Sequence, residues 1–321
     1  MTYTVGKHIQ RVRTAVASDE ATRSSVVASW RRCTYNYGLD PSGKVPRRLL
    51  SGGELKASTE RLEPMLFAAT ATLDRLQSIV VGMSCCILLA GLDGVPAHWR
   101  GRDADIDDLR QLGLWPGVDW SEQHEGTNGI GTCLVEKREM AIQREDHFHA
   151  RDVELSCVVA PIFDHRGQVA AALDIAYYGS APSDGLIGLL TFAVREAAWE
   201  IEAANFRQAF GPARLISVPD TTRACVGLIA VDDDDMVLGA TRAARQTLGV
   251  TDMALRDGIP AADLPLGAIC HGDTIANAER GTFRRTLART KGNISAAAKV
   301  LDISRATMKR KVKQYDLRRP V

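Results

Sequence analysis

The sequence predicts an α+β protein that ends in a separate all-α domain. Three observations support this fold class. Helical spacing of apolar residues prevails up to residue 79, and short apolar runs bounded by turn residues prevail from 85 to 176. The last forty residues carry twelve of the forty Lys and Arg side chains but only two of the thirty-nine acids. Such charge asymmetry predicts a nucleic-acid-binding module joined to a body with a different task.

The N-terminal region, residues 1–63, is predicted to be helical. Val26, Val27 and Trp30 lie at helical spacing, and the Tyr37-Gly38-Leu39-Asp40-Pro41 stretch ends that segment. Residues 61–79 predict a further helix, because leucines recur there every three or four residues.

An α+β domain is predicted over residues 64–210. Its expected strands are 85–90, 140–142, 157–163 and 168–176, with a hairpin signal at 91–95 and a turn at 164–167. A long amphipathic helix is expected over 186–206. A sheet of short strands framed by helices is typical of small-molecule sensor domains.

A shorter segment, 215–265, predicts two strands (226–232 and 236–239) and a helix (241–249). The acidic run from Asp232 to Asp235 between the strands could suggest cation binding, but a solvated turn is the simpler interpretation.

The C-terminal domain, 275–321, predicts three helices. The first contains Phe283 and Leu287 and ends at Lys291-Gly292; the second runs over 294–301 after the N-cap Asn293. A turn at 302–303 precedes the N-cap Ser304 and a third helix over about 305–315. This order predicts a helix-turn-helix, whose last helix lies in the major groove.

The third helix provides the candidate contacts to double-stranded DNA. Lysines and arginines satisfy phosphates, whereas Arg305 or Arg310 could pair with guanine and Thr307 could touch a thymine methyl group. A charged helix that merely solvates its own face is the alternative, but the three-helix pattern disfavours it. The candidate DNA-binding residues are Asn293, Ser304, Arg305, Thr307, Lys309, Arg310 and Lys313.

The segment 115–133 concentrates aromatic, polar and glycine residues. One interpretation is the wall of an effector pocket, in which aromatic rings enclose a small molecule and polar groups orient it. The other is a structural brace whose polar side chains satisfy their own backbone. The candidate effector-binding residues are Trp115, Trp120, His124, Glu125, Asn128, Cys133 and His147.

Metal, redox and enzyme functions have weaker support. His124, Cys133, His147, His149 and Cys157 are suitable ligand types, but no CxxC or HxxxH pair organises them. No metal or other cofactor is therefore expected. Cys133 or Cys157 could be a redox switch, although free cysteines are usually buried core residues. No nucleophile–base pair or paired carboxylates are evident, so we expect no enzyme.

The seven cysteines are scattered, unlike a disulfide framework: Cys33, Cys85, Cys86, Cys133, Cys157, Cys225 and Cys270. Neither a signal peptide nor an apolar run long enough to span a bilayer is evident. These features predict a cytoplasmic protein with reduced thiols and no membrane partner.

Two sets of motifs resemble known families. The stretch G-N-I-S-A-A-A-K-V-L-D-I-S-R-A-T-M-K-R-K-V-K-Q-Y is similar to the Fis-type helix-turn-helix of bacterial enhancer-binding activators. In that family the recognition helix opens at the positions of Ser304, Arg305 and Thr307 and continues through Lys309 and Arg310. The resemblance implies a homodimer on a near-palindromic site.

The motifs G-L-W-P-G-V-D-W-S-E-Q-H-E-G-T-N-G-I-G-T-C-L-V and A-P-I-F-D-H-R-G-Q-V-A-A-A-L-D resemble the GAF domain of acetoin-type regulators. In the family this domain senses a small effector. Residues 215–265 are similar to the truncated PAS-like linker of such proteins. Those activators place an AAA+ ATPase before the DNA-binding domain, but no G-x-x-x-x-G-K-[ST] loop exists here.

The sequence therefore predicts an effector-responsive, DNA-binding transcriptional regulator without an ATPase. Two alternatives stay open. One is an architectural DNA-binding protein whose GAF unit serves only as a dimerisation scaffold, and the other is a metal- or redox-sensing regulator.

Overall fold

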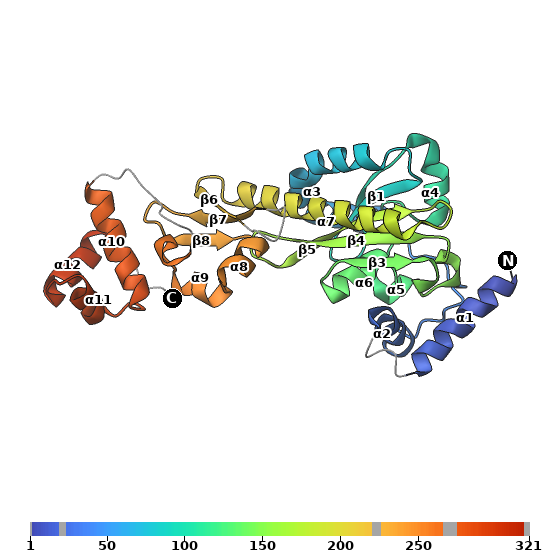
Figure 1. Cartoon of the computed structure of the whole chain (residues 1–321), viewed down its shortest axis with the longest axis horizontal. Helices are drawn as coiled ribbons and strands as arrows, with labels where there is room; N and C mark the ends of the chain where they lie inside the picture. Colours follow the sequence, from blue (N-terminus) through green and yellow to red (C-terminus); the bar gives the residue numbers. More distant parts are fainter. Residues whose placement is uncertain (1, 19–23, 220–225, 266–274, 318–321) are drawn as a thin grey trace. The chain divides into compact units, whose positions relative to one another are not determined.

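The computed structural model describes residues 2–18, 24–219, 226–265 and 275–317 (Figure 1). The predicted thiols Cys225 and Cys270 lie outside these ranges. The chain forms two compact units. The first contains Met1–Asp164 and Gln168–Asn205, and the second contains His165–Gly167 and Phe206–Val321.

Two helices open the N-terminal region, and residues 37–51 after them are not helical, in contrast to the prediction. Helix α1 spans Thr2–Ala17 and α2 spans Ser25–Arg31, which continues into the π-helical segment η2, Arg32–Asn36. The Ser24 side chain caps α2 by accepting a hydrogen bond from the Val27 amide. Trp30 is buried, and its Nε1 donates to the carbonyl oxygen of Asp146 at 2.9 Å. This tryptophan therefore ties α2 to the body of the first unit.

Helix α3 spans Gly52–Val80 and begins nine residues before the predicted helix 61–79. Its start is fixed by a capping box: Ser51 accepts from the Glu54 amide, and the Glu54 carboxylate accepts from the Ser51 amide. Gly52 and Gly53, which follow the cap, are poor helix formers. Leucine spacing therefore does not predict a helix start at this position.

The first unit contains a five-stranded antiparallel sheet in the order β2-β1-β5-β4-β3. The predicted strands and the predicted hairpin are confirmed, and β2 is the additional partner of that hairpin. The strands are β1 Cys85–Ala90, β2 Pro96–Arg100, β3 Met140–Gln143, β4 Ser156–Phe163 and β5 Val169–Tyr177.

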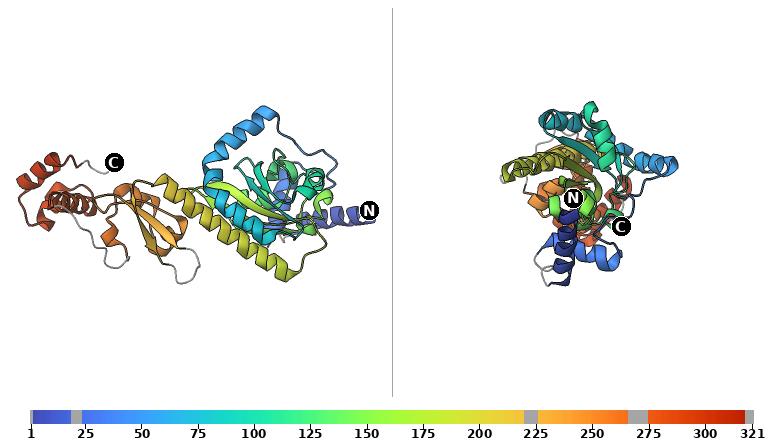
Figure 2. Two further views of the ribbon diagram at one scale, coloured as in Figure 1. Left: turned by 90° about the horizontal axis from the view of Figure 1, so that it is seen from above. Right: turned by 90° about the vertical axis from the view of Figure 1, so that its right-hand side faces the viewer.

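Helices cover both faces of this sheet (Figures 1 and 2). Helix α3 and the long helix α7, Asp184–Ala209, bury one face, where Leu73 and Val194 are inaccessible to solvent. The other face lies under α4 Ile106–Leu112, α5 Glu122–Glu125 and α6 Gly129–Glu136. Cys85 and Cys86 belong to opposite faces, as the alternation of a strand requires. Three short 3₁₀ segments complete the unit: Asp103–Asp105, Arg144–Asp146 and Ala150–Asp152.

The second unit begins with a small sheet in the order β6-β7-β8, which we call the three-stranded unit (residues 206–265). The two predicted strands and the predicted helix are present. Its elements are β6 Arg214–Val218, β7 Gly227–Val231, β8 Val237–Ala240, α8 Arg242–Leu248, α9 Asp252–Asp257 and η6 Ala261–Asp263. Ile229, Val231 and Ala244 are fully buried in a core of its own.

Three helices complete the second unit: α10 Ile275–Arg289, α11 Ile294–Val300 and α12 Arg305–Gln314. Lys291 and Gly292 have φ values of 51° and 73°, so the chain turns where the sequence predicts the end of the first helix. Within the described part of the chain, no helix is long and apolar enough to cross a membrane.

Candidate DNA-binding and effector sites

Helices α10–α12 pack around a small apolar core. Met308 is fully buried, and Phe283, Leu287, Ala297 and Ala298 are at most 7% exposed. The small alanines let α11 approach its neighbours closely. Burying Met308 fixes the rotation of α12 and therefore decides which of its side chains face solvent.

The exposed face of α12 is basic. Arg305, Lys309, Arg310 and Lys313 are solvent-exposed, and none makes an ion pair among the described residues. Lys311 differs, because its ammonium lies 2.5 Å from Glu279 of α10. Thr307 is half-buried, with its hydroxyl 2.9 Å from that of Ser304. Four unpaired cations on one exposed helix face suit contact with a polyanion.

Asn293 and Ser304 act as helix caps. The Asn293 Oδ1 accepts from the amides of Ser295 and Ala296 at 3.1 Å, and the Ser304 Oγ accepts from the Thr307 amide at 3.0 Å. Both caps are confirmed. The contribution of these two residues to DNA binding stays a prediction.

The acidic run Asp232–Asp235 forms a turn as predicted, and Asp233 is exposed, but the prediction of a solvated turn is wrong for Asp234. Asp234 is 4% exposed, and its carboxylate accepts from Arg280 at 2.9 Å and from Arg284 at 2.8 Å. Burial alone raises the pKa of Asp234, but hydrogen bonds from the two arginines outweigh it and lower the pKa. The arginines lie on α10, about fifty residues away in sequence, so local sequence could not reveal the pairing.

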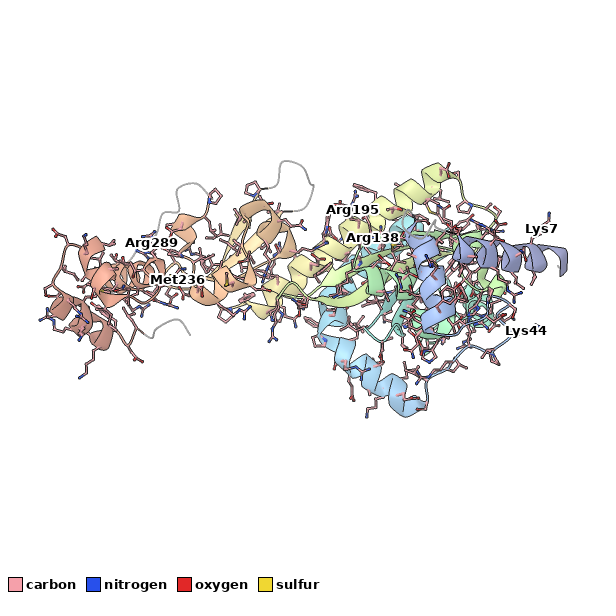
Figure 3. The ribbon with its side chains drawn as sticks, turned by 90° about the horizontal axis from the view of Figure 1, so that it is seen from below. Lys7, Lys44, Arg138, Arg195, Met236 and Arg289 are labelled. Carbon is pink, nitrogen blue, oxygen red and sulfur yellow. The ribbon has the colours of Figure 1, made fainter. Side chains whose placement is uncertain are left out.

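The remaining arginines of α10 are also paired. Arg285 donates to the carbonyl oxygen of Asp234 at 3.0 Å, and Arg289 (Figure 3) donates from Nε to Asp263 at 2.8 Å. We call the four arginines Arg280, Arg284, Arg285 and Arg289 the docking arginines, because they hold α10 against the three-stranded unit.

Two of the candidate effector residues brace the 115–133 segment. The Trp120 Nε1 donates to the Gly113 carbonyl oxygen at 2.8 Å. Asn128 caps α6 by accepting from the Gly131 amide at 2.8 Å, and its Nδ2 donates to the carbonyl oxygens of Trp120 and Gly126. A Cβ at Gly131 would lie 2.4 Å from the Glu122 amide nitrogen, so only glycine permits this contact. For Trp120 and Asn128, these contacts match the structural-brace interpretation.

Glu125 is buried in a charged network. Its Oε2 accepts from Arg151 at 2.6 Å, and Arg47 lies 3.7 Å away. Burial raises the pKa of Glu125 to about 7 against the opposing effect of Arg151. Neither arginine was a candidate, because both are distant in sequence and no local pattern marks them.

The other candidates lie in three different surroundings. Trp115 is half-buried against Trp99, with ring centroids 4.6 Å apart, and Cys133 is fully buried. His147 is buried, and its Nδ1 lies 3.0 Å from the Arg144 carbonyl oxygen. His124 is exposed, and its Nδ1 lies 3.0 Å from Asp119. The seven candidates therefore differ in burial and in partners, and their role in effector binding stays a prediction.

Asp174 is a buried acid that the sequence reasoning missed. It lies on β5 opposite Val159 and Leu88, is 1% exposed, and its Oδ1 has no hydrogen-bond partner among the described residues. Burial raises its pKa to about 8, partly opposed by a hydrogen bond with Cys157. The available signal was an aspartate at an inward position of an otherwise apolar strand.

The described cysteines have free, buried thiols: Cys33, Cys85, Cys86, Cys133 and Cys157. Burial raises the pKa of the Cys133 and Cys157 thiols, which disfavours the reactive thiolate form. Across the ranges that the structure describes, no three His, Cys, Asp or Glu side chains gather where a metal ion could be held.

Two family profiles match the chain. The GAF domain matches residues 67–201, and the bacterial regulatory protein, Fis family, matches residues 274–315. The first match covers the five-stranded sheet with the C-terminal half of α3 and most of α7, and the second covers α10–α12. The chain therefore contains a GAF domain and a Fis-family helix-turn-helix.

Curated relatives include acetoin-type regulators. The chain is 35% identical over 196 residues to the acetoin catabolism regulatory protein of Cupriavidus necator, covering 61% of this chain and 29% of that protein. It is 26% identical over 215 residues to the acetoin dehydrogenase operon transcriptional activator AcoR of Bacillus subtilis, covering 65% of this chain and 35% of that protein. The chain thus spans about a third of the length of these relatives.

A solved structure shares the fold. The crystal structure of the E. coli DhaR(N)-DhaL complex contains a chain that aligns with a TM-score of 0.52 at 14% identity, over 71% of this chain and 76% of that one. At this identity the likeness concerns the fold alone.

Proposed function

We propose that this protein is a transcriptional regulator that binds duplex DNA through α12 and responds to a small molecule bound by the first unit. The observation that carries the proposal is the exposed face of α12, where four cations have no ion-pair partner among the described residues. Duplex DNA is a partner that satisfies such a row of charges.

The proposed docking follows the helix-turn-helix geometry. Helix α12 enters the major groove, and Arg305 or Arg310 pairs with guanine while Lys309 and Lys313 contact phosphates. The N-terminal ends of α11 and α12, at Asn293 and Ser304, face the DNA backbone. Thr307 contacts a base near the start of the helix.

A homodimer is part of the proposal. Phe67 of α3 and Phe192 of α7 are 74% and 50% exposed, and Ile79 and Leu189 of the same helices are also exposed. Exposed apolar side chains on a helix pair suit a self-complementary contact. A two-fold dimer would place two copies of α12 on half-sites about 34 Å apart, as a near-palindromic operator requires.

DNA occupancy itself is the proposed output. Nine residues, 266–274, connect the three-stranded unit to α10, and no phosphate-binding loop motif occurs in the sequence. We therefore propose a non-enzymatic, cytoplasmic regulator in which the effector shifts the population of DNA-binding dimers. The names of the acetoin-type relatives support a small-molecule effector.

Selection of bound duplexes from a randomised library tests the DNA-binding half of the proposal. We expect enrichment of a near-palindrome with half-sites one helical turn apart. Recovery of unenriched sequence, with affinity set only by salt concentration, would contradict the regulator and favour the architectural alternative.

The architectural alternative has one structural observation in its favour. Trp120 and Asn128 are engaged in internal hydrogen bonds, as expected if the first unit is a rigid dimerisation scaffold. Thermal denaturation against a library of small metabolites separates the two functions, because only a sensor gains stability from a ligand.

A further inference from the structure

The first unit contains a cavity that none of the family matches assigns a role. Its volume is about 690 Å³, ample for a small metabolite. Its walls come from α1, from the connection between η2 and α3, and from the segments around His124 and His149. Its apolar wall consists of Ile9, Leu39, Val45 and Pro46.

The polar wall of this cavity is mainly basic. Arg13, Arg48 and Arg151 line it, but each is paired: Arg13 with Asp40 at 3.2 Å, Arg48 with Asp119 at 3.1 Å, and Arg151 with Glu125 at 2.6 Å. Lys44 (Figure 3) also lines it and makes no ion pair within the described ranges. Asp40 is the single acid among the lining residues. Lys44 is solvent-exposed and contributes a positive charge that has no ion-pair partner among the described residues.

His149 adds a second unsatisfied group. It is 5% exposed, it lines the cavity, and its Nδ1 has no hydrogen-bond partner in the part of the chain that the structure describes. Burial, together with the nearby Arg151, lowers the pKa of His149 to about 4, so the ring is neutral at physiological pH. A Cβ at Gly43, where φ is +63°, would lie 3.2 Å from the His149 Cβ, so glycine permits this close approach.

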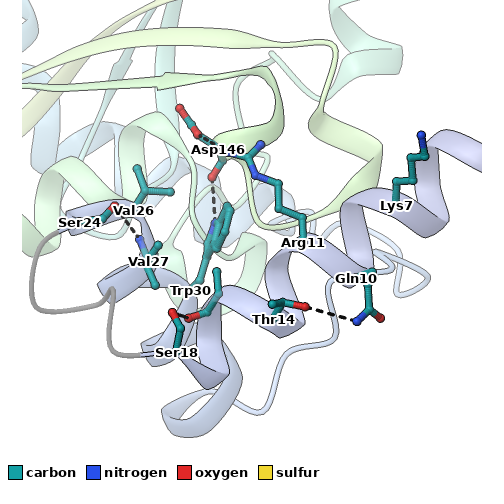
Figure 4. A pocket seen from close by; sticks show the side chains of 11 residues that line it. Lys7, Gln10, Arg11, Thr14, Ser18, Ser24, Val26, Val27, Trp30 and Asp146 are labelled. Atoms are coloured by element: carbon teal, nitrogen blue, oxygen red, sulfur yellow. Dashed lines mark hydrogen bonds and ion pairs between the residues drawn. The ribbon is translucent and has the colours of Figure 1, made fainter.

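A second cavity, between α1 and α2, lacks these properties. Many of its lining groups satisfy one another (Figure 4): Trp30 donates to the Asp146 carbonyl oxygen, Gln10 to Thr14, and the Val27 amide to Ser24. Among the described residues that line it, no buried side-chain atom lacks a hydrogen-bond partner. The cavity beside His149 instead offers an unpaired cation and an unpaired ring nitrogen.

We propose that the cavity beside His149 is the effector site and that it binds a small organic carboxylate. The carboxylate lies against the Lys44 ammonium and the Arg13 guanidinium, while the His149 ring nitrogen hydrogen-bonds to a polar substituent of the ligand. The short carbon chain packs against Leu39 and Pro46. This inference rests on the proposed effector response, retains His124 as a lining residue, and places the ligand away from Cys133 and His147.

Occupancy would have a direct structural consequence. A ligand carboxylate competes with Asp40 for Arg13, and this exposed ion pair is one of the contacts between the connecting segment and α1, beside the packing of Tyr37 and Leu39 in one cluster with Val12 and Val16. The ligand then links α1 to the 38–48 segment from within the cavity. Binding is thereby coupled to the order of the N-terminal helix.

Titration of the full-length protein with matched probes tests the site. The probes are butanoate, 2-hydroxybutanoate and butanedioate, each compared with its uncharged amide by calorimetry and thermal denaturation. We expect at least one acid to raise Tm and to bind at least about tenfold more tightly than its amide, since a charge-assisted contact is at stake. Lys44→Gln should weaken that binding about tenfold or more. Lys7→Gln is the control, because Lys7 lines the other cavity and should leave affinity unchanged.

Three results would overturn the proposal: no acid binds, an amide binds as well as its acid, or Lys44→Gln leaves the affinity unchanged. Tight binding of an amide would still support an effector-responsive regulator, but it would exclude a carboxylate as the ligand group that the site requires. Failure of every probe, with sequence-selective DNA binding intact, would overturn this site and leave the DNA-binding half of the proposed function standing.

Discussion

Helices α10 and α12 are both rich in basic residues, but their charges have opposite roles. The docking arginines of α10 are all paired with aspartate side chains or carbonyl groups of the three-stranded unit. The exposed cations of α12 have no such partner among the described residues. Basic composition therefore does not by itself identify a DNA-contacting helix. The position of acidic partners, which only the fold supplies, decides which cations remain available.

The same distinction separates two buried aspartates. Asp234 has two arginine partners and a lowered pKa, whereas Asp174 lies in an apolar core and has a raised pKa. A cation partner thus determines whether burial keeps a carboxyl group ionised or neutral.

The largest expected effect comes from Asp174→Asn. This substitution replaces the buried carboxyl group that has no cation partner among the described residues. The folded-state pKa is about 8 and the unfolded value about 3.8. Wild-type stability should therefore fall as pH rises from about 4 to 8, by up to roughly 1.4 kcal/mol per pH unit from this group. Urea unfolding across this range should show a smaller slope for Asp174→Asn and greater stability at pH 8. A stability difference that is constant with pH would show that Asp174 is ionised in the folded protein.

Asp234→Asn tests the other side of that comparison. It leaves Arg280 and Arg284 without their carboxylate, and because both arginines are about a third exposed we expect a loss of about 2 kcal/mol in unfolding free energy. DNA affinity of the folded protein should change less than about twofold, since α12 is untouched. The control is Asp263→Asn, an exposed partner of Arg289, which should cost less than about 1 kcal/mol.

The pairing contribution of Asp234 also has a definite pH dependence. Because its folded pKa lies below the unfolded value of 3.8, the stabilisation is present above that value and is lost as pH falls below it. Equal loss of stability in the Asp234→Asn and Asp263→Asn variants would contradict the difference in burial on which the prediction rests.

The double substitution Lys309→Gln and Arg310→Gln should weaken DNA binding and leave stability almost unchanged, the reverse of what we expect for Asp234→Asn. Both side chains are exposed, so unfolding free energy should change by less than about 0.5 kcal/mol. DNA affinity in gel-shift titrations should fall about tenfold or more, and the slope of log K against log salt should decrease by about two. Unchanged affinity would show that α12 does not contact DNA through these side chains. It would also contradict the proposed difference between the available cations of α12 and the paired arginines of α10.

Local signals were sufficient for most elements. Strands 85–90 and 157–163 were predicted within one residue, and the caps Asn293 and Ser304 lie where expected, because alternation and capping chemistry act over a few residues. The early start of α3 was missed because two glycines, Gly52 and Gly53, lie between the two residues of its capping box. Strand β2 was missed because Pro96–Arg100 contains too few β-forming residues to identify without its partner β1.

The sequence predicted the candidate DNA-binding face better than the candidate effector site. The cation face of α12 follows from helical periodicity once Met308 is taken as buried. Trp120 and Asn128 are engaged by backbone groups within eight residues of them, whereas Glu125 is held by Arg151, 26 residues along the chain. Arg47 and Arg151, which hold Glu125, carry no local signal of that role.

The sequence by itself determined the α+β class, the three-helix C-terminal domain and the rotation of α12, because periodicity and caps are properties of neighbouring residues. The tertiary structure alone decided which charges are paired, which aspartate is neutral and which cavity has unsatisfied groups. Those outcomes depend on contacts such as Asp234 with Arg284 and Arg151 with Glu125, which join residues far apart in the chain. Electrostatic free energies depend on such distances and on burial, and neither is encoded in any short stretch of sequence.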